Sequence, residues 1–178
     1  MIQLKRLFSE VEAVETSDCI VDLPQGARLL VQLKCTPTAI VQVQLKRLTP
    51  AQIEPPRPQK TSKLAQAAYQ QLVAYAQGKL QVFDLPLAAV GTEFQHQVWQ
   101  ALLQIPYAHK VSYQSLAQAV GCPQGARAIG QANGRNPWPL LVPCHRVIRA
   151  DGSLGGYSGG LEIKKYLLAH ESQMAHPG

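Results

Sequence analysis

Signals for export and for membrane insertion are missing from this sequence of 178 residues. No apolar run approaches the roughly 18 residues that would indicate a membrane span. The first residues also lack the hydrophobic stretch and the small-residue cleavage site of a signal peptide. Hydrophobic residues make up 46% of the chain and charged residues only 16%, so the chain can bury a core of its own. We therefore expect a soluble, cytoplasmic protein with no membrane partner.

Cysteine is scarce, and the four residues lie far apart, at Cys19, Cys35, Cys122 and Cys144. No two of them form a C-x-x-C pair, so their spacing indicates neither a disulfide framework nor a zinc finger. This use of cysteine favours a reducing compartment.

Carboxylates are absent from residues 124–150, a stretch that holds Arg127, Arg135, Arg146 and Arg149. The whole chain carries a net charge of +6. Such a charge is compatible with a polyanion partner such as nucleic acid, although many proteins with this charge bind none. The local cluster of arginines is therefore more informative than the total.

The N-terminal part has the pattern of a small α/β unit. Apolar and polar residues alternate over residues 29–34 and 41–46, which predicts two strands, and Thr36-Pro37-Thr38 between them predicts the turn of a hairpin. Residues 50–58 contain four prolines and are typical of a connector.

A helix is expected after the connector. Thr61 or Ser62 can cap its start, Leu64, Ala68, Leu72 and Ala76 form its apolar face, and Gly78 lies near its expected end. No catalytic constellation is present in residues 1–84, so we interpret this part as a supporting scaffold.

The C-terminal part is predicted to be mostly helical. Apolar residues recur at helical spacing from Phe94 to Leu102, Ser112 can cap a second helix that ends at Ala119, and a third helix is expected over residues 124–132. Two short helices joined by a glycine-containing turn suggest a helix-turn-helix.

Cys144 is the candidate nucleophile because it is followed by His145 and Arg146. A cysteine reacts as its thiolate, and a nearby imidazole or cation lowers the thiol pKa. Buried free cysteines are common, however, and neighbours in sequence need not face each other. From these residues alone, a structural cysteine stays open.

The segment Pro143-Cys144-His145-Arg146-Val147 resembles the active-site signature of the O6-alkylguanine-DNA alkyltransferases, the methylated-DNA–protein-cysteine methyltransferases. Further motifs agree with this family in order: Gly91-Thr92-Glu93-Phe94, Val98-Trp99, Ile105-Pro106-Tyr107, Ser112-Tyr113, Ala126-Arg127-Ala128, Asn133-Gly134-Arg135-Asn136-Pro137 and Tyr157-Ser158-Gly159-Gly160. The likeness covers roughly residues 80 to 172.

The resemblance implies an irreversible, single-use transfer of an alkyl group from the O6 atom of guanine to Cys144. His145 would act as the base through a bound water, and Glu171 would orient His145, as in a catalytic triad. Tyr113 would help to protonate the departing guanine at N3.

The resemblance also implies a pocket for the base. Tyr157 and Ser158 would form its wall, and the main-chain carbonyls of Cys144 and Val147 would accept hydrogen bonds from the guanine amine. Asn136 would be the hinge between the recognition helix and the active-site segment.

The implied partner is double-stranded DNA. A stacked guanine cannot reach a buried sulfur, so the nucleotide would flip out. The second helix of the helix-turn-helix would enter the minor groove, where small residues permit close approach, and Arg127 would fill the gap left by the base. The small residues would also fit tight helix packing, and Arg127 would also fit a phosphate contact. The residues expected at the DNA are Ala126, Arg127, Ala128, Gly130, Ala132 and Arg135.

We thus expect a mixed α/β (α+β) monomer: a small ribonuclease-H-like domain over residues 1–84 and a mostly helical domain with a helix-turn-helix over residues 85–178. Some relatives bind a structural zinc through N-terminal cysteines and histidines. No histidine precedes His96 here, so we expect no metal, and no cofactor is implied.

Two alternatives differ in chemistry. The first is a helix-turn-helix protein that recognises DNA without catalysis, as cysteine-free relatives do. The second is a cysteine hydrolase, which is disfavoured because no oxyanion hole can be derived from the sequence. The preferred size of the alkyl group and activity on O4-alkylthymine stay open.

Overall fold

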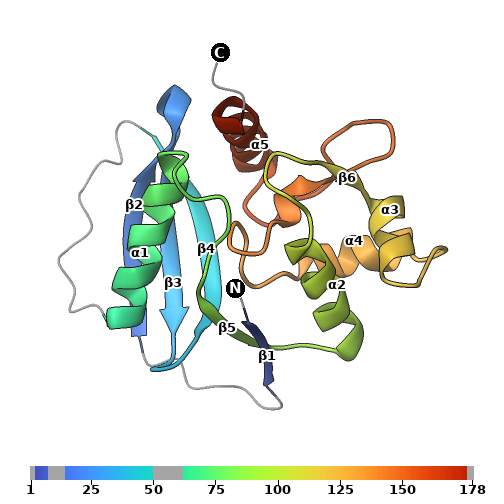
Figure 1. Ribbon diagram of the computed structural model, residues 1–178, viewed down its shortest axis with the longest axis horizontal. Coiled ribbons are helices and arrows are strands. Elements are labelled where there is room, and N and C mark those ends of the chain that lie inside the picture. The colour runs from blue at the N-terminus through green and yellow to red at the C-terminus, as the bar shows by residue number, and fades with distance from the viewer. Residues whose placement is uncertain (1–2, 8–14, 50–61, 176–178) are drawn as a thin grey trace. The chain divides into compact units, whose positions relative to one another are not determined.

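The computed structural model describes residues 3–7, 15–49 and 62–175, and it divides into two compact units, Met1–Val90 and Gly91–Gly178 (Figure 1). Both helices and sheet are present, which confirms the expected mixed α/β class. The division lies after Val90 rather than after Asp84, because residues 86–90 form a strand of the N-terminal sheet.

The N-terminal unit contains a five-stranded sheet with the order β1-β5-β4-β3-β2. Its elements are β1 (Gln3–Leu7), β2 (Glu15–Asp22), the short 3-10 turn η1 (Pro24–Gly26), β3 (Arg28–Cys35), β4 (Ile40–Leu48), α1 (Lys63–Ala76) and β5 (Pro86–Val90). Strands β2, β3 and β4 are antiparallel neighbours, whereas β5 runs parallel to both β4 and β1. Helix α1 covers one face of the sheet and contacts β2 and β3 (Figure 1).

The hairpin of β3 and β4 follows from the alternation in the sequence. Every second residue of β3 is buried, from Leu29 to Cys35, so one face of the strand forms the core. The turn is closed by the Thr36 N–H, which donates to the Ala39 carbonyl at 2.9 Å. The predicted connector over residues 50–58 lies outside the described residues.

Both ends of α1 are fixed by local hydrogen bonds. The Ser62 hydroxyl accepts from the Ala65 N–H at 3.2 Å, which satisfies one free donor of the first turn. At the other end Gly78 has a φ of 71°, which lets the Lys79 N–H reach the Ala74 carbonyl at 2.9 Å. The predicted start and end signals of this helix are thus confirmed.

The C-terminal unit is mostly helical. It comprises α2 (Glu93–Leu103), β6 (Val111–Ser112), α3 (Tyr113–Ala119), α4 (Ala126–Gly134), the 3-10 turn η3 (Cys144–Arg146), β7 (Val147–Ile148) and α5 (Leu161–Ala175). Helices α3 and α4 pack against each other, and Gly121 in the connecting turn has a φ of 73°. This is the arrangement that the helix-turn-helix prediction requires, although the second helix begins at Ala126 rather than at residue 124.

Helix α2 braces α4 through a buried indole. The Trp99 ring donates from Nε1 to the Ala132 carbonyl at 3.0 Å. It also packs edge-on against Trp138, with 5.5 Å between ring centroids. Trp99 therefore joins α2, the end of α4 and the segment that follows it.

Among the described residues, no helix is long and apolar enough to cross a membrane, and no group of three or more histidine, cysteine, aspartate or glutamate side chains could hold a metal ion.

We predict that Trp99→Phe destabilises the C-terminal unit by about 1–3 kcal/mol, because a buried hydrogen bond is lost and the smaller ring leaves space. The measurement is urea unfolding, together with hydrogen exchange of the α4 amides. Gln100→Ala changes an exposed neighbour on the same helix and serves as the control. Equal effects of the two substitutions would contradict the bracing role.

Candidate active site

Cys144 begins the 3-10 turn η3 and is only 1% exposed. Its N–H donates to the Val142 carbonyl at 2.8 Å, and the same carbonyl accepts from Asn136 Nδ2 at 3.0 Å. Asn136 also accepts the Trp138 N–H at 3.0 Å through its side-chain oxygen. Asn136 follows α4 directly, so its buried amide ties the end of that helix to the segment that carries Cys144.

Glu171 on α5 joins several groups inside the unit, and its side chain is fully buried. Its carboxylate accepts from His145 Nε2 at 2.8 Å and from the Arg146 guanidinium at 2.9 Å. It also accepts from the Ala108 N–H at 3.0 Å. The structure therefore brings Glu171 and His145 together, as the resemblance implied, and it adds Arg146 as a second charged partner.

Arg146 is held by further contacts away from Cys144. Its Nη1 donates to the Ile105 carbonyl at 2.7 Å. The sequence suggested that Arg146 supplies the cation that lowers the pKa of Cys144, but the guanidinium is bound to Glu171. Arg146 is thus part of the carboxylate's environment.

Burial and hydrogen bonding together determine the protonation states of His145 and Glu171. Burial lowers the pKa of His145, against the opposing effect of Glu171. Burial alone would raise the pKa of Glu171, but hydrogen bonds from His145 and Arg146 hold it well below the usual value. A neutral His145 that donates from Nε2 has a free lone pair on Nδ1, and Nδ1 is buried with no hydrogen-bond partner among the described residues. Nδ1 can therefore accept a proton.

The Cys144 thiol is protonated at neutral pH. Burial raises its pKa to about 11, although the Asn136 amide and the Lys164 charge act in the opposite direction. Reaction of this sulfur therefore requires a base, and His145 is the adjacent residue with an unused acceptor.

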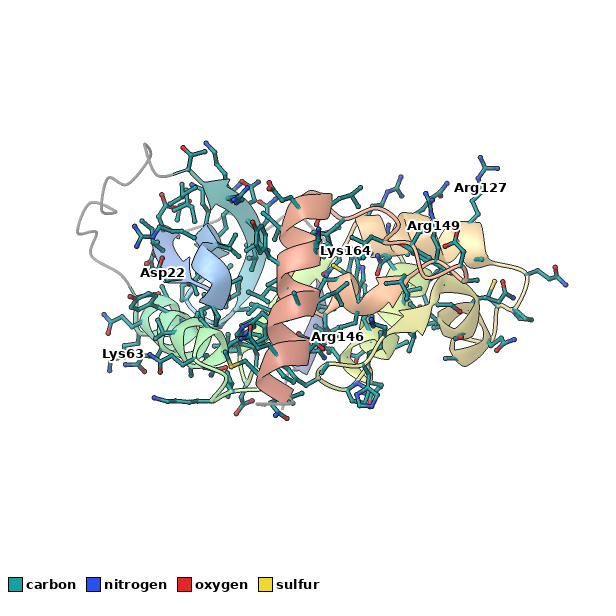
Figure 2. The ribbon with its side chains drawn as sticks, turned by 90° about the horizontal axis from the view of Figure 1, so that it is seen from above. Asp22, Lys63, Arg127, Arg146, Arg149 and Lys164 are labelled. Carbon is teal, nitrogen blue, oxygen red and sulfur yellow. The ribbon has the colours of Figure 1, made fainter. Side chains whose placement is uncertain are left out.

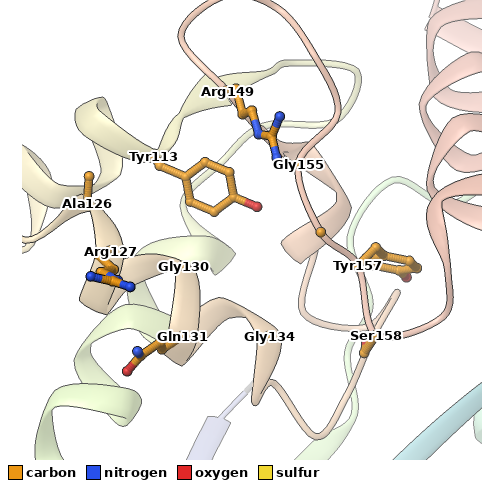
Figure 3. Close-up of a pocket in the computed structure, with 11 residues that line it drawn as sticks. Tyr113, Ala126, Arg127, Gly130, Gln131, Gly134, Arg149, Gly155, Tyr157 and Ser158 are labelled. Atoms are coloured by element: carbon orange, nitrogen blue, oxygen red, sulfur yellow. The ribbon is translucent and has the colours of Figure 1, made fainter.

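An open cavity of about 750 Å³ lies in this unit between α4 and the loop before α5 (Figure 3). This volume is within the range of small-molecule sites. Its lining includes two arginines and no carboxylate among the residues that the structure describes: Tyr113, Ala126, Arg127, Gly130, Gln131, Gly134, Arg149, Gly155, Gly156, Tyr157 and Ser158. Three residues implied for substrate handling, Tyr113, Tyr157 and Ser158, are thus brought to one cavity.

Tyr113 packs directly on the backbone of Gly155. A Cβ atom built at Gly155 would lie 2.8 Å from the Tyr113 hydroxyl, and Gly155 has a φ of 51°. Only glycine fits this contact without strain. Burial, and secondarily the neighbouring Cys144, raise the pKa of Tyr113. The Cys144 sulfur does not line the cavity, but it is close enough to Tyr113 to influence the pKa of the Tyr113 hydroxyl.

The residues expected at the DNA fall into three groups. Ala126, Arg127 and Gly130 line the cavity, and Figure 2 shows Arg127 extending away from α4. Ala128 and Arg135 are exposed but lie outside the lining. Ala132 is buried, so the expectation that it faces the minor groove is wrong. Its position on the inner face of α4, where Trp99 binds its carbonyl, explains the difference.

Sequence reasoning gave no role to Lys164, which lies on α5 and is fully buried. Its Nζ donates to the Val147 carbonyl at 2.6 Å. Val147, implied as an acceptor for the guanine amine, is itself buried. The available signal was helical spacing, because Lys164 shares the buried side of α5 with Ile163, Leu167 and Glu171.

Comparison with known proteins places these features in a family. Residues 93–173 match the model described as "6-O-methylguanine DNA methyltransferase, DNA binding domain". The methylated-DNA–protein-cysteine methyltransferase of Methanosarcina barkeri is 50% identical over 109 residues, which are 61% of this chain and 69% of that protein.

Solved structures are similar over a larger share of the chain. The O6-methylguanine methyltransferase of Mycobacterium tuberculosis has 35% identity and a TM-score of 0.70, covering 92% of this chain and 97% of that one. The Mycobacterium tuberculosis OGT in complex with DNA has 36% identity and a TM-score of 0.70, covering 87% of this chain and 92% of that one. On this sequence and structural similarity, the chain belongs to the methylated-DNA–protein-cysteine methyltransferase family.

Proposed function

We propose that this protein repairs double-stranded DNA by transferring the alkyl group of O6-alkylguanine to Cys144, once per protein molecule. The observation that carries the proposal is the buried hydrogen bond between Glu171 and His145, the residue that follows the protonated Cys144 in the chain. A base with an ionised partner is what a protonated thiol needs before it can act as a nucleophile. The names of the relatives specify the same acceptor, a protein cysteine.

The proposed reaction begins when the Cys144 thiol gives its proton to Nδ1 of His145 through a water molecule. Glu171 stabilises the imidazolium that forms. The thiolate then attacks the alkyl carbon, a carbon–sulfur bond forms, and the bond from that carbon to O6 breaks. The electron pair stays on guanine, which takes a proton at N3 from the Tyr113 hydroxyl; the phenolate regains a proton from solvent, and the imidazolium of His145 releases to solvent the proton that it took from the thiol. No group in the site reverses the thioether, so the protein is consumed.

Recognition of the base is assigned to the cavity. Tyr157 and Ser158 form one wall, and the carbonyls of Cys144 and Val147 accept from the guanine amine. The Tyr157 hydroxyl is buried without a hydrogen-bond partner among the described residues, so it offers a polar contact to an entering base.

DNA binding is assigned to the helix-turn-helix, with α4 in the minor groove and the damaged nucleotide flipped into the cavity. Support comes from the small residues Ala126 and Gly130 on the cavity side of α4 and from the nearby Arg127 and Arg149. We assign the N-terminal unit the role of a scaffold. Whether O4-alkylthymine is also a substrate is decided by offering that lesion in the assay below.

We predict that methyl transfer from labelled DNA reaches a plateau at one methyl group per protein, and that Cys144→Ala abolishes transfer but retains DNA binding. The measurement is intact-mass and peptide analysis after incubation with DNA that carries labelled O6-methylguanine. Cys122→Ala is the matched control and should retain full transfer, because Cys122 lies in the turn between α3 and α4. A plateau well above one, or label left on DNA that the protein binds, would contradict the proposal.

For Glu171→Gln we predict two effects. The free energy of unfolding falls by about 3–5 kcal/mol, because Arg146 keeps its charge inside the unit without an ionised partner. Where the variant remains folded, transfer is slower, because the protonated form of His145 loses its stabilising carboxylate.

The pH dependence distinguishes the two effects. The lowered pKa of Glu171 stabilises the fold above the ordinary carboxyl pKa of about 4.3, and this stabilisation is lost as the pH falls through the lowered value. Glu171→Gln should therefore flatten acid unfolding, whereas Glu162→Gln, an exposed change on the same helix, should not. Identical thiol reactivity of Cys144 against pH in the wild type, His145→Ala and Glu171→Gln would refute the proposed proton relay.

Arg127→Ala should slow repair of duplex DNA by about ten- to a thousand-fold, if roughly 1.4 to 4 kcal/mol of stabilisation of the extruded state is lost. Free O6-substituted guanine needs no flipping, so the variant should react with it at nearly the wild-type rate. The measurement compares single-turnover rates at saturating duplex with those on the free base.

Arg135→Ala is the control for Arg127→Ala, because Arg135 is exposed outside the cavity. A lost phosphate contact would weaken binding and reduce its salt dependence without slowing transfer at saturation. An equal loss of rate on duplex and on free base would remove the assignment of Arg127 to base extrusion.

A further inference from the structure

The Lys164 ammonium is surrounded by main-chain carbonyls. Its Nζ donates to the carbonyls of Val147 at 2.6 Å, Leu154 at 3.0 Å and Gly156 at 3.4 Å. An ammonium has three N–H donors, so these contacts use its full capacity. One side chain on α5 thus holds the strand β7 and the loop before α5 at the same time.

The charge of Lys164 has no fixed counter-ion. Among the residues that the structure describes, no carboxylate forms an ion pair with it. A buried cation without such a pair is costly, and burial lowers the pKa of Lys164 to about 8. The group therefore still carries its charge at neutral pH, at a free-energy cost that a purely structural residue would avoid.

The anion formed in the proposed reaction, the thiolate of Cys144, interacts electrostatically with the charge of Lys164. Lys164 acts to lower the pKa of Cys144, and an ionised Cys144 in turn acts to raise the pKa of Lys164. The counter-charge is absent while the thiol is protonated and appears when the proton leaves. A fixed charge placed where charge develops stabilises that state without any reorganisation.

The carbonyls that Lys164 holds are connected to the proposed base site: Gly156 lines the cavity, and the Val147 carbonyl is the acceptor proposed for the guanine amine. A carbonyl has two lone pairs, so Val147 can bind Lys164 and still accept from a guanine amine. Leu154 and Gly156 flank Gly155, on whose backbone Tyr113 packs. Movement of either carbonyl would therefore shift the wall of the cavity that carries Tyr113.

We propose that Lys164 is a positioning residue for alkyl transfer: its ammonium fixes the Val147 carbonyl and the loop around Gly155, and its charge favours the thiolate of Cys144. This inference rests on the proposed role of Cys144 as the alkyl acceptor. Lys164 contacts neither the alkyl group nor the base in the proposed reaction, so it acts through these neighbours.

Other titratable groups face the same two side chains. Around Cys144 and Lys164 they are Tyr113 from α3, His145 from η3, Arg149 after β7 and Tyr157 from the loop before α5. Both tyrosines have a raised pKa because of burial, so they stay neutral over the pH range used here. Changes between pH 6 and 10 that depend on Lys164 therefore arise from Cys144, His145 and Lys164.

The test is the pH dependence of Cys144 alkylation by iodoacetamide, followed by mass spectrometry of the peptide that contains this residue. Lys164→Met removes the charge and keeps the length of the side chain. Lys165→Met changes the exposed neighbour on the same helix and is the matched control. Peptide-level detection separates Cys144 from the three other cysteines.

We predict that Lys164→Met slows alkylation of Cys144 at pH 7 by about ten- to a hundred-fold, because the thiolate loses a nearby cation. The difference from the wild type should narrow as the pH rises through about 8, where Lys164 of the wild type loses its own charge. Single-turnover transfer from methylated DNA at pH 7 should fall by a similar factor. Lys165→Met should remain within about twofold of the wild type on both substrates.

Lys164→Gln distinguishes charge from hydrogen bonding, because its amide keeps donors for the carbonyls without the charge. It also serves if Lys164→Met does not fold. Slower alkylation at pH 7 in a folded Lys164→Gln, converging on the wild-type rate above about pH 8, supports the role of the charge. A wild-type rate at pH 7 in either folded variant, or a loss of rate that is equal at every pH, overturns the inference. If the wild type transfers no methyl group from DNA, the proposed function fails instead, whatever the variants show.

Discussion

The buried carboxylate of Glu171 is the group around which several segments of the C-terminal unit are held together. It is buried, yet it stays ionised because His145, Arg146 and a main-chain N–H all donate to it. Taking a carboxylate out of water costs several kcal/mol unless such partners replace its hydration. These donors come from two segments of the chain, η3 and the segment after α2, and the carboxylate lies on α5, so the charge can be satisfied only when all three are in their final places.

The hydrogen bond to Glu171 determines which nitrogen of His145 donates and which one can accept. A histidine that donates to a buried carboxylate has one possible neutral tautomer, and its other nitrogen is left as an acceptor. Cys144, the preceding residue in the chain, starts as a thiol because its burial raises the thiol pKa. In the proposed reaction, the resting site therefore contains both a proton donor, the Cys144 thiol, and a proton acceptor, Nδ1 of His145, before any proton is transferred.

The sequence predicted those elements that local chemistry defines. The hairpin over β3 and β4 follows from alternation, and the ends of α1 follow from Ser62 and Gly78, because neighbouring residues alone satisfy these hydrogen bonds. Strand β5 was not predicted, since its short apolar segment lacks alternation and its partners β1 and β4 are distant in sequence.

The pairing of His145 with Glu171 spans 26 positions and could be expected only from the family resemblance. No sequence signal marks the partners of Lys164, because any residue type can provide a main-chain carbonyl. The small residues of α4 were expected at the minor groove, and the structure shows that two of them, Ala126 and Gly130, line the cavity, while their contact with DNA stays a prediction. The burial of Ala132 was not predicted, because spacing alone does not distinguish the inner from the outer face of a short helix.

The burial of Cys144 protects its thiol from side reactions before the protein binds damaged DNA in the proposed reaction. A cell contains oxidants, disulfides and small electrophiles that react with exposed thiolates far more often than a rare lesion is encountered. A sulfur that is 1% exposed and protonated is a poor target for all of them. In the proposed reaction Cys144 is used once, so its thiol has to stay intact until a lesion is bound, and the burial that makes the thiol slow to react also protects it until then.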